Sequence, residues 1–192
     1  MKRRLLVLDN QSRYLPMLTE HLQGVSVDTK VVGPLREFGF NNFDGIVVSG
    51  RRVKPFSVEL RRRILDYYRT LYQEAAIPVL GICFGAEVLA FSYGAKLRRM
   101  PEGEFGPTPI RFHRTYPLCD GHRSLVVHQS HNMMIDSLPS CLENYASSNS
   151  CVNQALKHKS KPQFGVQFHP EMSENDTTLT NFVIQCGQHA RL

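Results

Sequence analysis

Tryptophan is absent from this chain of 192 residues, and no apolar run approaches the roughly 20 residues that a membrane span requires. The apolar segment near the N-terminus, Leu5–Leu8, is also too short for the core of a signal peptide. The cysteines are odd in number and form no Cys-x-x-Cys pair, which argues against a disulfide framework. They are Cys83, Cys119, Cys141, Cys151 and Cys186. These absences predict a cytoplasmic protein with no membrane partner.

The charge of the chain is basic but dispersed. Its 23 lysines and arginines exceed its 17 acidic residues, for a formal net charge of +6. The basic residues form short clusters such as Lys2–Arg4 and Arg61–Arg63, without a recognition-helix pattern, a zinc-ligand spacing or an aromatic–basic RNA motif. Solvated faces or contact with an acidic partner explain such clusters better, so no nucleic-acid partner is expected.

Apolar strands alternate with segments of helical spacing through the first half of the chain, and a strand-rich stretch follows. Strands are predicted at 5–9, 25–32, 45–50 and 77–82, then at 110–113, 124–128, 144–147 and 163–168. Helices are predicted at 11–22, 57–73, 84–93 and 177–188. This order predicts one α/β domain over residues 1–192, with a flavodoxin-like, mostly parallel central sheet and helices on both faces.

Cys83 lies between the strand predicted at 77–82 and the helix that follows it, and is flanked by Gly81 and Gly85. A tight strand–helix turn of this kind exposes its central side chain, as in the nucleophile elbow of hydrolases. The positive end of the helix would favour a thiolate, and the backbone N–H groups after the cysteine could stabilise an oxyanion. A buried structural cysteine between two packing glycines is the alternative for this motif alone.

A second motif places a base and a carboxylate at another strand end. The strand predicted at 163–168 runs into His169, Pro170 and Glu171. A cysteine nucleophile needs a base, and the base needs a carboxylate to orient it. His-Pro-Glu alone is a weak signal, but together with the cysteine turn it indicates a Cys83–His169–Glu171 triad.

The two motifs together, Gly-Ile-Cys-Phe-Gly and Gln-Phe-His-Pro-Glu, resemble the signature pair of the class I (triad) glutamine amidotransferases. The resemblance covers nearly the whole chain. Three further segments are similar to the glutaminase subunits and domains of GMP synthetase. They are Gly103–Gly106 (GEFG), Gln129–His131 (QSH), and Ala146–Ser148 with Lys157–Lys159 before the final strand.

This resemblance implies a mechanism and a set of site residues. Cys83 would attack the side-chain amide carbon of glutamine, His169 would transfer the proton, Glu171 would orient the imidazole, and water would hydrolyse the resulting thioester. The oxyanion would be held near Gly50, Arg51 and Phe84, and the substrate by Glu87, Ser130, His131 and Asn132. No metal or cofactor is implied. Because the glutaminase module uses essentially all 192 residues, the ammonia is expected to pass to a separate ATP-dependent synthetase subunit.

Two residues depart from the family pattern. Arg51 stands where the family has the second glycine of Ser-Gly-Gly-Pro. Arginine tolerates fewer backbone angles than glycine, so the loop is either shifted, with the Arg51 N–H still available to the oxyanion, or rebuilt on the surface. The guanidinium of Arg51 could also cover the site or bind an anion. Glu87 replaces a substrate-binding glutamine four residues after Cys83. It could bind the α-ammonium group, pair with Arg51 or Arg52, raise the pKa of the thiol, or mimic glutamine when protonated.

Two other functions stay open at this stage. The same triad could serve a stand-alone hydrolase of γ-glutamyl compounds, with Arg51 and Glu87 reshaping its specificity. The chain could also be a non-catalytic regulatory module, although such a module has no physical need for Cys83, His169 and Glu171 together.

Overall fold

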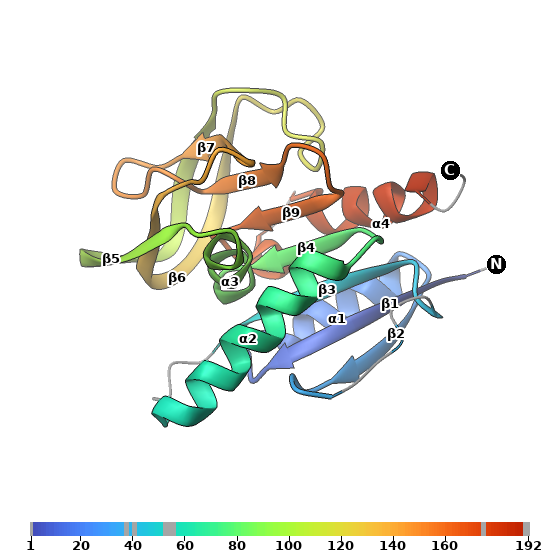
Figure 1. Cartoon of the computed structure of the whole chain (residues 1–192). Coiled ribbons are helices and arrows are strands. Elements are labelled where there is room, and N and C mark those ends of the chain that lie inside the picture. Colours follow the sequence, from blue (N-terminus) through green and yellow to red (C-terminus); the bar gives the residue numbers. More distant parts are fainter. Residues whose placement is uncertain (1, 37–38, 40–41, 52–56, 174–175, 190–192) are drawn as a thin grey trace.

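A computed structural model describes residues 2–36, 39, 42–51, 57–173 and 176–189 of the chain (Figure 1). These residues contain one nine-stranded sheet with the order β2-β1-β3-β4-β9-β8-β7-β5-β6. Its parallel part comprises β2 (Val27–Val32), β1 (Arg3–Asn10), β3 (Gly45–Arg51), β4 (Val79–Ile82) and β9 (Gln163–Val166). The antiparallel part comprises β8 (Ala155–His158), β7 (Leu142–Ser147), β5 (Lys96–Phe112) and β6 (Ser124–Ser137).

The helices cover both faces of the parallel strands (Figure 1). α1 (Leu15–Gly24) and α4 (Thr178–His189) contribute to one apolar cluster, with Leu18 and Phe182 among its buried side chains. α2 (Val58–Glu74) and α3 (Phe84–Ser92) contribute to another, with Tyr68 and Leu89. A short 3-10 helix, η2 (Pro170–Met172), follows β9. The sheet therefore separates two cores, as its nearly continuous apolar strands require.

Polar anchors fix α2 against the strand ends. Ser57 caps the helix and accepts a hydrogen bond from the Leu60 N–H at 3.2 Å. The buried hydroxyl of Tyr68 donates to Asn10 Oδ1 at 2.7 Å, and that of Tyr72 donates to the Gly85 carbonyl at 2.9 Å. α2 is thereby tied to the carboxyl end of β1 and to the first turn of α3.

The predicted α/β sheet with helices on both faces is confirmed, and its antiparallel part is larger than the short predicted strands suggested. β5 begins at Lys96 and passes through Pro101, Pro107 and Pro109, residues that argue against a strand when read locally. These prolines are exposed, and the pairing with β6 has a register shift between Arg99 and Glu104. Among the described residues, no helix is long and apolar enough to cross a membrane.

Candidate active site

Cys83 occupies a strained turn between β4 and α3. It is the N-cap residue of α3, with φ of 51° and ψ of −106°, a backbone conformation that residues other than glycine rarely adopt. Both flanking glycines are required by close packing. A Cβ atom on Gly81 would lie 2.4 Å from the Gly85 backbone, and one on Gly85 would lie 2.3 Å from the Val48 carbonyl oxygen. The turn thus has the strained backbone predicted for a nucleophile elbow, but the predicted exposure is wrong, because Cys83 is buried.

His169 and Glu171 form a buried pair just beyond β9. His169 Nδ1 lies 2.8 Å from Glu171 Oε1, and the side chains are 4% and 1% exposed. The backbone N–H of His169 donates to the His128 carbonyl on β6 at 2.9 Å, which fixes the segment against the sheet. Because a carboxylate accepts, Nδ1 carries the proton and Nε2 is left to take up another.

Gly50, at the end of β3, brings Cys83 and His169 together. A Cβ atom on Gly50 would lie 2.7 Å from His169 Cε1 and 3.6 Å from Cys83 Cβ, so the two side chains face the same point. β3, β4 and β9 are neighbours in the sheet. Gly50 lies at the end of β3, Cys83 directly follows β4, and His169 lies just beyond β9. The carboxyl ends of these three parallel strands therefore build one site, as expected for an open α/β sheet.

A cavity of about 610 Å³ opens beside Cys83. Its wall contains the predicted residues Arg51, Cys83, Phe84, Glu87, Ser130, His131 and Asn132. Side chains of α2 and β5, such as Leu65 and Arg99, complete it. The strand β6, which lies at the far edge of the sheet, therefore reaches back to the nucleophile turn with the segment Ser130–Met133. The volume is that of a small-molecule site.

The thiol of Cys83 is not poised as a thiolate in this structure, which corrects the expectation drawn from the helix end. Burial raises the pKa of Cys83 well above its usual value, and the nearby carboxylates of Glu87 and Glu171 raise it further. Hydrogen bonds from the Phe84 backbone N–H and from Gln167 lower the pKa but do not compensate. The helix terminus contributes in the predicted direction, and desolvation outweighs it. Deprotonation therefore requires a nearby base.

Glu87 is buried and bonded to a residue that sequence analysis did not single out. Gln167 Nε2 donates to Glu87 Oε1 at 3.1 Å and lies 3.9 Å from Cys83 Sγ. Burial raises the pKa of Glu87, whereas Gln167 and the charges of His131 and His169 lower it. Of the roles considered for Glu87, an effect on the thiol pKa is supported. The proposed pairing with Arg52 involves a residue outside the described part of the chain. Gln167 precedes His169 by two positions and belongs to the Gln-Phe-His-Pro-Glu motif, which is the signal that could have found it.

Replacing Glu87 by glutamine is expected to make Cys83 more reactive. Removing the carboxylate lowers the pKa of the thiol, so a larger share is thiolate at a given pH. We expect the alkylation rate of Cys83 by iodoacetamide at pH 8 to rise at least about threefold, measured by peptide mass spectrometry. Glu74→Gln, at the opposite end of α2 from the cavity-lining Arg61, is the matched control. An unchanged or slower rate would show that Glu87 does not act on the thiol.

Arg51 lines the cavity from the end of β3. Its Cζ atom lies 5.9 Å from the centre of the Phe84 ring, a cation–π arrangement. Burial lowers the pKa of Arg51, and the neighbouring Tyr68 opposes that shift. Arg51 thus lies at the cavity, as one of the sequence-based alternatives expected, and Gly50, the residue before it, lies against His169.

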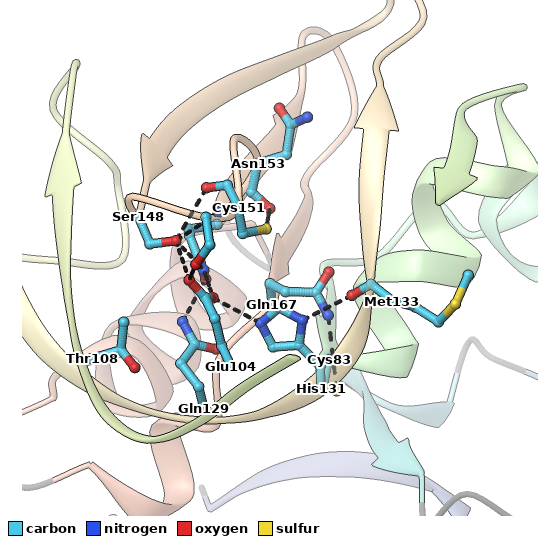
Figure 2. A network of polar contacts seen from close by, with 12 residues as sticks. Cys83, Glu104, Thr108, Gln129, His131, Met133, Ser148, Cys151, Asn153 and Gln167 are labelled. Atoms are coloured by element: carbon cyan, nitrogen blue, oxygen red, sulfur yellow. Dashed lines mark hydrogen bonds and ion pairs between the residues drawn. The ribbon is translucent and has the colours of Figure 1, made fainter. Parts of the chain in front are cut away.

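Tyr14 and Glu104 are two further residues at the site that sequence analysis did not place there. The Tyr14 ring packs edge-on against His169, with ring centres 4.6 Å apart, and its hydroxyl lies 3.1 Å from His128 Nε2. Glu104 contacts His131 behind the cavity wall, with 3.1 Å between Oε2 and Nε2 (Figure 2). Both contacts join segments distant in sequence, and the family resemblance marked the segment that contains Glu104 without giving it a role.

Comparison with known proteins identifies the family. The family model described as "Glutamine amidotransferase class-I" matches residues 6–186. The chain belongs to the class I glutamine amidotransferases. The glutamine-hydrolysing GMP synthase subunit of Methanocaldococcus jannaschii is 30% identical over 191 residues, which cover 95% of this chain and 97% of that protein. The corresponding subunit of Pyrococcus abyssi is 29% identical, with 96% and 99% covered.

Solved structures of other amidotransferases agree with this assignment. A Thermoplasma acidophilum protein described as a GMP synthase subunit superposes with a TM-score of 0.90 and 26% identity, over 100% of this chain and 97% of that one. A glutamine amidotransferase of Thermotoga maritima has a TM-score of 0.76 at 22% identity, over 100% and 85% of the two chains, which bears on the fold alone. The amidotransferase fold predicted from the two sequence motifs is therefore confirmed.

Proposed function

We propose that this chain hydrolyses the side-chain amide of glutamine and delivers the ammonia to a separate ATP-dependent synthetase subunit that makes GMP. The observation that carries the proposal is the convergence of Cys83 and the His169–Glu171 pair on Gly50, beside a cavity of about 610 Å³. A nucleophile, a base and an orienting carboxylate in this order are the requirements of acyl transfer through a covalent intermediate. Membership of the class I glutamine amidotransferases supports glutamine as the substrate.

In the proposed reaction His169 takes the proton of the Cys83 thiol as the sulfur attacks the amide carbon of glutamine. The C–N bond of the tetrahedral intermediate then breaks, and ammonia leaves with the proton returned by His169. Water, activated by the same imidazole, attacks the γ-glutamyl thioester and releases glutamate and the thiol. Glu171 keeps Nδ1 protonated and stabilises the imidazolium that forms in each half-reaction.

The cavity wall supplies the remaining roles in this proposal. The backbone N–H groups at Gly50, Arg51 and Phe84 stabilise the oxyanion, supported by the contact of Gly50 with His169 and by the Phe84 N–H bond to the Cys83 sulfur. Glu87 and the β6 residues Ser130, His131 and Asn132 hold the α-amino and carboxylate groups of glutamine. Every step uses groups that the chain itself provides.

The proposed partner follows from the chemistry of ammonia and from the relatives. Ammonia released into neutral water is mostly protonated and no longer nucleophilic, so the site must discharge into a synthetase. Two relatives are named as glutamine-hydrolysing subunits of GMP synthase, and the chain spans 97–99% of their length. We therefore assign the chain to a two-subunit GMP synthase acting in the cytoplasm.

The test combines the purified chain with the ATP-dependent GMP synthase subunit of the same organism. With xanthosine monophosphate, ATP and glutamine, we expect GMP to form, and ammonia release from glutamine to rise when the partner is added. Ammonium chloride should support GMP formation by the partner alone, which controls for its integrity. An active partner that gains no glutamine-dependent activity from this chain would overturn the assignment.

A stand-alone hydrolase of γ-glutamyl compounds is the second candidate, and the arginines of the cavity favour it. Arg51, Arg61 and Arg99 line the same cavity as Cys83 and could bind a carboxylate-bearing substituent on the amide nitrogen. Hydrolysis of γ-glutamyl-glutamate that is faster than hydrolysis of glutamine, and that is unaffected by the synthetase subunit, would favour this candidate.

A further inference from the structure

Glu104 is the centre of a buried polar network behind the cavity wall (Figure 2). One carboxylate oxygen accepts from the hydroxyls of Ser148 and Ser150. The other accepts from Gln154 Nε2 at 2.7 Å and lies 3.1 Å from His131 Nε2. Both oxygens are thus surrounded by donors. Burial alone would raise the pKa of Glu104, but the hydrogen bonds from His131, Ser148 and Ser150 outweigh it and lower the pKa to about 2. The carboxylate is therefore ionised.

Both ring nitrogens of His131 face acceptors. Nδ1 lies 2.8 Å from the Met133 carbonyl oxygen, which cannot donate, so Nδ1 carries a proton. Nε2 faces the ionised Glu104, so it must donate as well. A neutral imidazole has one N–H and could serve only one of these acceptors. The side chain is 2% exposed, so water cannot replace the missing bond. The geometry therefore requires an imidazolium paired with a carboxylate.

His131 connects this network to the cavity. Ser130, His131, Asn132 and Met133 all line the cavity beside Cys83. The Nδ1–H bond to the Met133 carbonyl fixes the backbone of this segment from behind. We propose that Glu104 is a positioning residue that keeps His131 as an imidazolium, so that His131 holds the Ser130–Met133 wall in the geometry that receives glutamine. This inference rests on the proposed glutaminase function.

A metal site is the other interpretation of this cluster. The ligand atoms of Glu104, His131 and Cys151 all lie within 4.8 Å of one another. Hydrogen bonds already occupy both carboxylate oxygens and both imidazole nitrogens, and the Cys151 thiol donates to the Asn153 carbonyl at 3.8 Å. Burial raises the pKa of Cys151 to about 12, so the thiol is neutral. The donor set is satisfied as it stands, and a cation would have to displace these bonds.

The other charged groups around the pair come from several elements. Glu87 on α3 interacts with His131 across the cavity wall, and His169 beyond β9 acts on the same carboxyl. Arg98 on β5 acts on Cys151 and is paired with Asp136 of β6 at 2.8 Å. Glu87 is therefore the acidic neighbour whose influence on His131 must be separated from that of Glu104. A Glu87→Gln background provides that separation, because it removes the carboxylate and keeps the side-chain size.

Replacing Glu104 by glutamine keeps the shape of the network and removes its charge. Without the charge of Glu104, His131 is expected to be a neutral imidazole at higher pH, with one N–H, and to lose one of its two hydrogen bonds. At pH 8 we expect the KM for glutamine to rise at least about fivefold, the effect of one lost hydrogen bond, while kcat changes by less than about threefold. As the pH is lowered to 6, the KM of the variant should approach that of the wild type. The ratio of the two KM values removes the pH effects that both proteins share.

Two control variants and one spectroscopic measurement complete the test. Glu143→Gln removes a partly exposed carboxylate paired with Arg114 and should leave KM unchanged. Ser150→Ala keeps the Glu104 charge and should raise KM without any pH dependence. In the unaltered chain, ¹⁵N NMR of the His131 ring should show both nitrogens protonated at pH 8. This measurement needs no variant and does not depend on glutaminase activity.

The outcomes separate this inference from the proposed function. A neutral His131 ring at pH 8 in the wild type would overturn the inference, as would a KM ratio for Glu104→Gln that does not change with pH. If either of these results were found while hydrolysis of glutamine still required Cys83, the proposed function would stand and only the inference about Glu104 would fail. Wild-type protein with no Cys83-dependent hydrolysis would overturn the function and the role toward glutamine, while the NMR result would still decide the charge of His131.

Discussion

Cys83→Ala is expected to lower ammonia release from glutamine by at least about 10³-fold, because the covalent route is lost with the sulfur. The fold should survive, since alanine fits the space of the buried thiol and the positive φ of 51° is equally unfavourable for either residue. The midpoint of thermal unfolding should therefore change little while the rate collapses. An ammonia assay on protein of verified fold measures the effect.

Cys119→Ala is the matched control for this prediction. Cys119 is also a buried cysteine, with its sulfur 3.7 Å from the Thr178 hydroxyl, in the core on the α1–α4 side of the sheet. We expect its removal to affect stability and to leave the rate per folded molecule within about twofold. Equal losses in the two variants would indicate damage to the fold and would refute a specific role for Cys83.

His169→Ala is expected to have an effect of similar size, about 10³-fold or more on kcat. Burial and nearby carboxylates raise the pKa of the Cys83 thiol, so its deprotonation depends on the imidazole. The loss should shrink as the pH is raised, because hydroxide then removes the proton that His169 takes in the wild type. A pH series of single-turnover hydrolysis on the variant and the wild type measures both effects.

His128→Ala separates the base from its neighbour. The His128 ring lies 3.1 Å from the Tyr14 hydroxyl, and only its backbone carbonyl supports His169, so the alanine variant keeps that bond. We expect a change of less than about tenfold in kcat from the altered packing of Tyr14. A larger loss of kcat for His128→Ala than for His169→Ala would show that His169 is not the base.

The sequence analysis could bring Cys83 and His169 together because both follow neighbouring strands of one parallel sheet. Cys83 and His169 follow apolar segments, and strand ends of one parallel sheet meet at one edge, so two local motifs were enough to place them together. Gly50 came instead from the family resemblance, and the structure puts it against both side chains. The placement of Cys83 and His169 needed only local patterns and the rule for parallel sheets.

The parts that sequence reasoning missed depend on contacts between distant segments. The Glu104–His131 pair requires the register of two long antiparallel strands, and the prolines and glycines of β5 hide that strand from a periodicity analysis. The thiol pKa was predicted only in part, for a related reason. The helix terminus and the effect of Glu87, four residues along the helix, can be read from the sequence, whereas the burial of Cys83 and the approach of Glu171 appear only in the folded chain.

The covalent state of Cys83 during turnover tests the central claim most directly. The chain is mixed with glutamine, with and without the synthetase subunit, quenched in acid within milliseconds to seconds, and analysed by peptide mass spectrometry. We predict a γ-glutamyl adduct on the peptide that contains Cys83, which disappears as glutamine is exhausted and is absent from Cys83→Ala. Ammonia release at the wild-type rate from Cys83→Ala, with no adduct on the wild-type peptide, would contradict the account.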